Sequence, residues 1–167
     1  MKKYEFTGET MIFCGITLHR IVSVRDVGHI KSGSIGGWIE TEKNLSQDGS
    51  SWVSDNAFVY GDALVSDNAR VSGDALVYGD ALVHGNAWVY GNAWVYDDAR
   101  VYDDARVYDN ARVYDNARVC GDALVSDNAR VSGDAWVYGN ARVSGDALVY
   151  GNARVSGNLN TQLEKQA

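Results

Sequence analysis

The sequence of 167 residues contains no proline and only two cysteines. Because proline fixes φ and removes a backbone donor, its absence means that no residue forces a break in a regular backbone. Cys14 and Cys120 lie far apart and form no CxxC or Cys/His pattern, which excludes a disulfide framework and a zinc site. The sequence shows no leader and no apolar run that could cross a bilayer, so we predict a cytoplasmic protein without membrane contact.

Lysine and glutamate are missing from residues 53–158, although both occur on either side of that segment. The segment instead carries eight arginines and fifteen aspartates, so the formal net charge of −7 of the whole chain resides there. An excess of negative charge repels the phosphates of a nucleic-acid backbone. The sequence therefore argues against direct nucleic-acid binding.

The same segment contains a repeat of six residues. Valine occupies every sixth position from Val53 to Val155, and alanine precedes it by two positions from Ala57 to Ala153. A period of six fits neither an α-helix nor a heptad, but Ala-x-Val-Tyr alternates inward and outward side chains as a strand does. The Gly, Asp and Asn residues that follow favour tight turns. Short strands and corners in regular succession predict an all-β solenoid.

The unit V-x-x-x-A-x resembles the hexapeptide repeat of the left-handed parallel β-helices of the LpxA-like superfamily. That resemblance implies a single-stranded, left-handed parallel β-helix with three hexads per triangular coil. Residues 51–158 would then form about six coils of about 18 residues each. The resemblance also implies that the chain associates with itself as a trimer or dimer.

A second resemblance covers the entry into the repeat. The stretch SGSIGGWIETEKNLSQDGSSWVSDNAFVYGDA is similar to the start of YdcK-like bacterial and prophage proteins, in which a GGWIE…NLS segment leads into NA-x-V-x-G repeats. It implies the cytoplasm of a bacterium or of a phage-infected host cell. Proteins of this kind are named acetyltransferases on fold resemblance, so acetyl-CoA is the cofactor that the resemblance would bring.

The ends of the chain depart from the hexad. We predict a small β-rich cap over residues 1–50, with turns at Gly8, at Gly15 and over 32–37. Trp38, Ile39 and Leu45 are expected to contact the first coil. Residues 159–167 read as a C-terminal tail, in which Leu159 takes the alanine position and Thr161 the valine position of a closing hexad.

The outward positions differ between the three faces that such a coil would have. One face gathers most of the aromatic residues and is the predicted interface: Phe58, Tyr60, Leu76, Tyr78, Trp94, Tyr96, Tyr114 and Tyr150. One interpretation is a ladder of stacked side chains that stiffens the sheet. The other is a contact surface for a second copy or for a protein partner, because flat aromatic surface beside arginine is typical of interfaces.

Aspartates at the corners invite a metal-binding interpretation. Asp62, Asp80 and Asp98 fall in one column, with Asp97 and Asp115 in the column beside it. A divalent cation such as Ca²⁺ would relieve the repulsion between neighbouring carboxylates. Asparagine alternates with aspartate in these columns, however, which indicates a requirement for a turn-forming side chain. The sequence therefore predicts no metal site.

Catalysis has one candidate residue on the predicted solenoid, His84. The repeat has no insertion from residue 53 to 158, so no loop is available to build a site around that histidine. Cys120 would lie two coils away, ~10 Å, which is too far for a nucleophile and base. The sequence favours a protein without catalytic residues and without a cofactor; an acyltransferase is the class expected if the chain has an activity.

Three functions stay open at this point. The first is a rigid solenoid that presents aromatic and Arg/Asp ladders for self-association or protein binding. The second is an acetyltransferase-like protein that uses acetyl-CoA. The third is a phage-derived acidic mimic, or an inhibitor of a host nucleic-acid-binding or defence protein.

Overall fold

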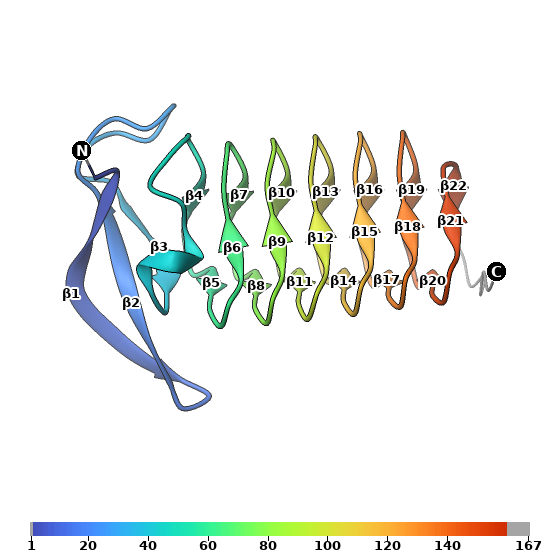
Figure 1. The fold of residues 1–167 in the computed structure, drawn as a ribbon, viewed down its shortest axis with the longest axis horizontal. Helices are drawn as coiled ribbons and strands as arrows, with labels where there is room; N and C mark the ends of the chain where they lie inside the picture. Colours follow the sequence, from blue (N-terminus) through green and yellow to red (C-terminus); the bar gives the residue numbers. More distant parts are fainter. Residues whose placement is uncertain (1, 160–167) are drawn as a thin grey trace.

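The computed structural model describes residues 2–159 and shows a parallel β-solenoid (Figure 1). Equivalent residues of adjacent coils are 18 positions apart in the sequence, as Asn92 and Asn110 are. The coils stack in a row behind an N-terminal hairpin, and the described residues contain no α-helix. Residues 2–159 also contain no helix long and apolar enough to span a membrane. The all-β solenoid expected from the period of six is thus confirmed.

Three sheets run along the solenoid, and each coil adds one strand of two residues to each sheet. Sheet 1 consists of β1 (Tyr4–Phe13), β2 (Ile16–Ser23), β3 (Ile35–Ile39), β5 (Phe58–Val59), β8 (Leu76–Val77), β11 (Trp94–Val95), β14 (Arg112–Val113), β17 (Arg130–Val131) and β20 (Leu148–Val149). Sheet 2 consists of β4 (Trp52–Val53), β7 (Arg70–Val71), β10 (Trp88–Val89), β13 (Arg106–Val107), β16 (Leu124–Val125), β19 (Arg142–Val143) and β22 (Asn158–Leu159). Sheet 3 consists of β6 (Leu64–Val65), β9 (Leu82–Val83), β12 (Arg100–Val101), β15 (Arg118–Val119), β18 (Trp136–Val137) and β21 (Arg154–Val155).

Backbone hydrogen bonds join each coil to the next. The outward residue of each strand donates its N–H to an alanine carbonyl one coil on, as Phe58 does to Ala75 at 2.9 Å. The residue after the valine donates likewise to a valine carbonyl, as Tyr60 does to Val77 at 3.1 Å. Stacking therefore satisfies the polar backbone groups that an isolated coil would expose.

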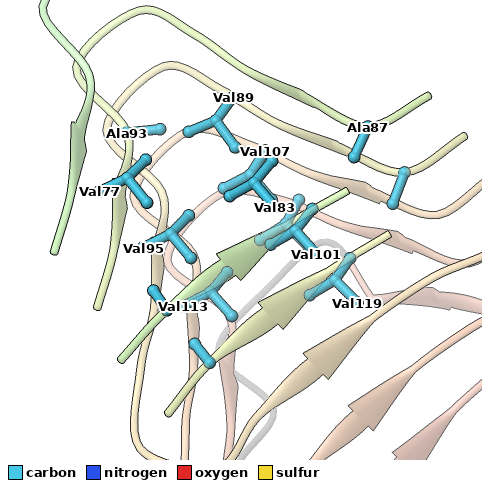
Figure 2. Packing of buried hydrophobic residues seen from close by; sticks show 14 of the residues in the cluster. Val77, Val83, Ala87, Val89, Ala93, Val95, Val101, Val107, Val113 and Val119 are labelled. Carbon is cyan, nitrogen blue, oxygen red and sulfur yellow. The ribbon is translucent and has the colours of Figure 1, made fainter. Parts of the chain in front are cut away.

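The interior consists of the repeated valines and alanines, which are almost completely buried from Val53 to Val155. Figure 2 shows valines of all three sheets pointing into the same space, among them Val95, Val101 and Val107. Burial of one of these valine side chains contributes roughly 1.5–3 kcal/mol. One coil buries few side chains, so stability accumulates only as coils are added.

Parallel pairing begins earlier in the chain than residue 51. Trp38 and Ile39 of β3 pair with Phe58 and Val59, and Leu45 forms a parallel bridge with Val65. The expected contacts of Trp38, Ile39 and Leu45 with the first coil are confirmed. These residues, together with the 3₁₀ helix η1 (Glu42–Asn44), supply an incomplete coil of their own, which brings the solenoid to about seven turns.

In the N-terminal segment, two of the three expected turns differ from the prediction. Gly15 does lie in the turn between β1 and β2, next to Cys14 with φ of 49°. Gly8, in contrast, lies within β1, where the pairing with β2 shifts register between Phe6 and Thr10. The expected turn over 32–37 ends before β3, because that strand begins at Ile35 and pairs with β2.

A buried lysine ties the first strand to the first coil. The Lys3 ammonium is fully buried and donates to the Ser51 carbonyl at 2.9 Å and to the Ser51 hydroxyl at 3.0 Å. Burial, and then the positive charge of Arg25, lower the pKa of Lys3 to about 8. Nothing in the sequence indicates this residue, because its acceptors are backbone and hydroxyl oxygens some 48 positions away.

The prediction for the closing hexad is wrong at the last described strand. Leu159 pairs with Val143, so it occupies the valine position and not the alanine position. The corner before it is shorter, because the bend at Gly157 leads directly into β22 without the two-residue turn of the other corners. Thr161 and the rest of the tail lie outside the described residues.

Candidate functional site: the outward faces and corners

Opposite charges occupy different parts of the solenoid surface. The eight arginines of the repeat are the outward residues of strands, whereas the fifteen aspartates lie in the corners between strands. This segregation follows from the hexad: the outward strand position holds Arg, Leu, Trp or Phe, and the two turn positions hold Gly, Asp or Asn. The flat faces are therefore cationic and aromatic, and the corners are acidic.

Sheet 1 brings the predicted interface residues together. Tyr60, Tyr78, Tyr96 and Tyr114 form a column in which neighbouring ring centroids lie 5.0 Å apart and the planes differ by at most 3°. At the N-terminal end, Phe13 from the hairpin contacts both Phe58 and Tyr60 edge-on. Leu76 and Trp94 pair in neighbouring strands, and Tyr150 lies in the last described coil of the same face. The ladder interpretation accounts for the tyrosines, whose ring faces cover one another.

Arginine and tryptophan stack on one another along the faces, a feature the sequence reasoning missed. On sheet 2, the guanidinium carbons of Arg70 and Arg106 lie 5.1 and 5.5 Å from the centre of the Trp88 ring. On sheet 1, Arg112 lies 4.6 Å from Trp94. The sequence does indicate that these side chains are neighbours, because the two members of each pair are three hexads apart and so occupy the same column on adjacent coils. A cation over an indole face is held by the ring quadrupole.

A hollow of about 240 Å³ lies on sheet 2 beneath the loop that connects β2 to β3. Its walls include Trp52, Trp88 and Arg70, together with His29 and Ile30 from the loop. The Arg70 guanidinium donates to His29 Nδ1 at 2.9 Å, which joins the loop to the face. His29 had no indicated role in the sequence.

His84 and Cys120 are not brought into contact with each other. The His84 ring stacks on Tyr102 with centroids 5.2 Å apart, and its Nδ1 lies 3.7 Å from an Asp67 carboxylate oxygen. Cys120, one coil beyond Tyr102, is buried and accepts a hydrogen bond from Trp136 Nε1 at 3.1 Å. The geometry gives His84 an acidic neighbour and an aromatic neighbour but places no nucleophile beside it.

The corner aspartates stabilise the backbone of the turns. The residue at the first turn position has positive φ whether it is Asp or Gly, as in Asp127 at 58° and Gly133 at 67°. Where a glycine follows one coil later, the aspartate carboxylate accepts its N–H, as Asp127 does from Gly145 at 2.9 Å. Side-chain amides at the second position form a parallel ladder, for example from Asn92 to Asn110 at 3.2 Å.

The metal candidates Asp62, Asp80 and Asp98 lie exposed at one corner. Within residues 2–159, no group of three or more His, Cys, Asp or Glu side chains is arranged to hold a metal ion. At another corner, turn residues do form side-chain hydrogen bonds, as Asp127 does with Gly145 and Asn92 with Asn110, which agrees with the turn requirement inferred from the Asn/Asp alternation.

Substitution of Asp127 separates the two roles of a corner aspartate, which are to adopt a positive φ and to accept a hydrogen bond from the next coil. Asp127→Gly keeps a residue that accepts positive φ and loses the carboxylate that accepts from the Gly145 N–H and from the Ser126 hydroxyl, so we expect a cost of about 1 kcal/mol. Asp127→Ala loses the same hydrogen bonds and also puts alanine, which tolerates the left-handed region less well than aspartate or glycine, at a positive φ, so we expect about 2 kcal/mol. Urea unfolding followed by circular dichroism measures both values. Equal stability of the two variants would contradict the backbone role.

Two stacked tyrosines, Tyr96 beside sheet 1 and Tyr102 beside sheet 3, predict a loss of stability at high pH. Burial, followed by the neighbouring Tyr78 and Tyr114, raises the pKa of Tyr96 to about 12, and burial with a Cys120 hydrogen bond does the same for Tyr102. Because these values exceed the ordinary 10.0, the stabilisation is complete below pH 10 and is lost as the pH rises toward 12. Tyrosinate absorbance at 295 nm should show a group of tyrosines titrating near pH 12, with the midpoint of urea unfolding falling between pH 10.5 and 12. Titration of every tyrosine near pH 10 in the folded protein would contradict this.

The fold and its surface define the class of this protein: a parallel β-solenoid built from regular coils of three hexads, with outward ladders of aromatic, arginine and corner side chains. The repeat matches the family described as YdcK Beta solenoid repeat in overlapping copies within residues 57–85 and 99–151. These two stretches of the solenoid are thus similar to the YdcK β-solenoid repeat.

A relative of the chain occurs in Escherichia coli (strain K12), where it is named "Uncharacterized acetyltransferase YdcK". The two sequences are 31% identical over 70 residues. The match covers 36% of this chain and 22% of the relative, so it spans about a fifth of the relative's length.

Proposed function

We propose that this protein is a non-catalytic structural and interaction protein, a rigid rod that presents aromatic and charged ladders for self-association or protein binding. The observation that carries the proposal is the regular stacking of large outward side chains in columns, above all the four tyrosines of sheet 1 at 5.0 Å spacing. Side chains that are already ordered in the unbound protein lose little entropy when a partner covers them. Aromatic residues and arginine are also the residue types enriched at protein interfaces.

The test compares two faces of the same rod. In the first variant, Trp94→Glu plus Tyr96→Glu place charge on sheet 1; in the matched control, Trp88→Glu plus Tyr90→Glu make the same change at the equivalent positions of sheet 2. We expect the wild type to associate in sedimentation velocity experiments, the sheet 1 variant to dissociate, and the control to behave as the wild type. A monomeric wild type, or association unaffected by the sheet 1 variant, would contradict self-association through this face.

The name of the relative favours a second candidate, an acetyltransferase-like protein that binds acetyl-CoA. This candidate predicts that acetyl-CoA raises the melting temperature of the protein and that the effect saturates. Our proposal predicts no change of melting temperature at millimolar acetyl-CoA. His84 is the residue to substitute if a saturable shift occurs, since it is the histidine that the solenoid carries.

A further inference from the structure

The repeat holds many opposite charges, yet its arginines and aspartates are not paired with each other. Within residues 2–159, none of the eight repeat arginines has a carboxylate within 4.0 Å, although fifteen aspartates lie in the adjoining corners. The ion pairs that do form involve Lys2, Lys31 and His84. Four of the arginines instead stack on tryptophan rings: Arg70, Arg106, Arg112 and Arg154.

Two of the remaining arginines stand side by side. Arg100 of β12 and Arg118 of β15 are directly paired on adjacent coils of sheet 3, and both are exposed. Like charges directly opposite one another on neighbouring strands destabilise a sheet. A negative group placed over this pair would therefore be attracted by two guanidinium groups at once.

The corner between sheet 1 and sheet 3 is the most acidic of the three. We call it the acidic ridge; its six aspartates are all exposed and consist of Asp62, Asp80, Asp97, Asp98, Asp115 and Asp134. It borders sheet 3 directly, since Asp97 and Asp98 precede Arg100 and Asp115 precedes Arg118. The Arg100–Arg118 pair, which can donate hydrogen bonds, and the aspartates of the acidic ridge, which can accept them, thus lie next to each other along the rod.

We infer that a second copy of this chain binds here, with its acidic ridge over the Arg100–Arg118 pair and with its own arginine pair over the first ridge. Because the two stripes are neighbours on one surface, a two-fold axis brings both contacts together and closes the assembly as a dimer. A second copy also has the same distance between coils, so its aspartates repeat along the rod in step with the arginines. This inference rests on the proposed function, of which it names the partner; the contact adjoins the sheet 1 face, because Tyr96 directly precedes the ridge residue Asp97.

The overall charge of −7 per chain does not oppose such a contact at physiological salt. Repulsion between whole chains acts over distances that exceed the Debye length of about 8 Å and is screened. Arginine–carboxylate pairs at the contact are much closer and are screened less. The dimer should nevertheless weaken on the order of tenfold when salt is raised from about 0.15 to 1 M.

A pair of charge reversals tests the contact. The first variant, Arg100→Glu plus Arg118→Glu, makes sheet 3 acidic at the contact. The second variant makes the ridge basic, because four lysines then outnumber the two aspartates that remain; it combines Asp62→Lys, Asp80→Lys, Asp98→Lys and Asp134→Lys. These four positions are chosen because they lack the positive φ of Asp97 and Asp115, so lysine fits their backbone. Circular dichroism melting curves check that both variants fold.

In a dimer of either variant alone, sheet 3 and the partner's ridge carry charge of the same sign in both halves of the contact. We therefore expect the dimer dissociation constant of each variant to rise on the order of tenfold or more. An equimolar mixture restores opposite charges in both halves, so native mass spectrometry and sedimentation should show the mixed dimer. Wild-type association by either folded variant alone, or a mixture that stays monomeric, would overturn the inference. If the wild type dissociates with Trp94→Glu plus Tyr96→Glu but neither charge reversal has an effect, the proposed function stands and only this contact fails.

Discussion

Replacing Val131 by aspartate is expected to lower the free energy of unfolding by more than about 4 kcal/mol. Val131 is fully buried and pairs with Val113 and Val149, so the new carboxylate would lie in an interior of valine and alanine without a polar partner. Because coils are stabilised by their neighbours, the loss should spread along the rod toward the C-terminal end. Urea unfolding followed by circular dichroism and by tryptophan fluorescence measures the change.

Arg130→Asp is the matched control, because it places the same side chain one residue earlier on the exposed side of β17. We expect a change within about 0.5 kcal/mol, since surface substitutions of this kind rarely cost more. Similar stabilities of the two variants would contradict the assignment of inward and outward positions.

Gly37→Ala is expected to detach β3 and the hairpin from the first coil, at a cost of about 2–3 kcal/mol. A Cβ on Gly37 would lie 2.7 Å from the Ala57 carbonyl oxygen and 2.7 Å from Val53 Cγ1. Both groups belong to the fully buried interior, and the carbonyl accepts the Trp38 N–H, so neither can move without breaking the parallel pairing. Faster hydrogen exchange of the Trp38 and Glu40 amides, whose acceptors lie in the first coil, would report the loss directly.

Gly157→Ala serves as the control for that substitution. A Cβ on Gly157 meets no atom within 4 Å, and its φ lies outside the left-handed region. We expect unchanged stability and unchanged exchange of the two amides. If the Trp38 and Glu40 amides exchange as slowly in Gly37→Ala as in the control, the close approach at Gly37 does not hold the cap on the first coil.

Most of the solenoid could be predicted because its signal is local and repeated. Each Ala-x-Val step specifies the same inward pair, and each Gly or Asp at the first turn position specifies the same positive φ, so an error at one hexad would be corrected by the others. The cap gives no such repetition. Gly8 reads as a turn but forms an irregularity within β1, and Leu159 reads as an alanine position but shifts register after a shortened corner. Pairing across the chain decides both positions, and a single sequence does not show that pairing.

The surface was predictable in part for the same reason. Columns that join equivalent positions of adjacent coils placed the sheet 1 tyrosines together, as the structure has them. The side chains of Arg106 and Trp88 share such a column too, but their stacking depends on rotamers that a repeat pattern does not specify. The segregation of arginine from aspartate was visible as positions in the hexad, whereas the absence of ion pairs between them in the described residues required distances.

Sedimentation equilibrium of the wild-type chain tests the central claim most directly, namely that the outward ladders serve to bind another protein surface, first of all a second copy. One chain has a mass of 18.2 kDa. Between micromolar and hundred-micromolar concentration at physiological salt, we predict a reversible rise of the average mass to twice that value. A constant mass of one chain over the whole range would contradict the claim.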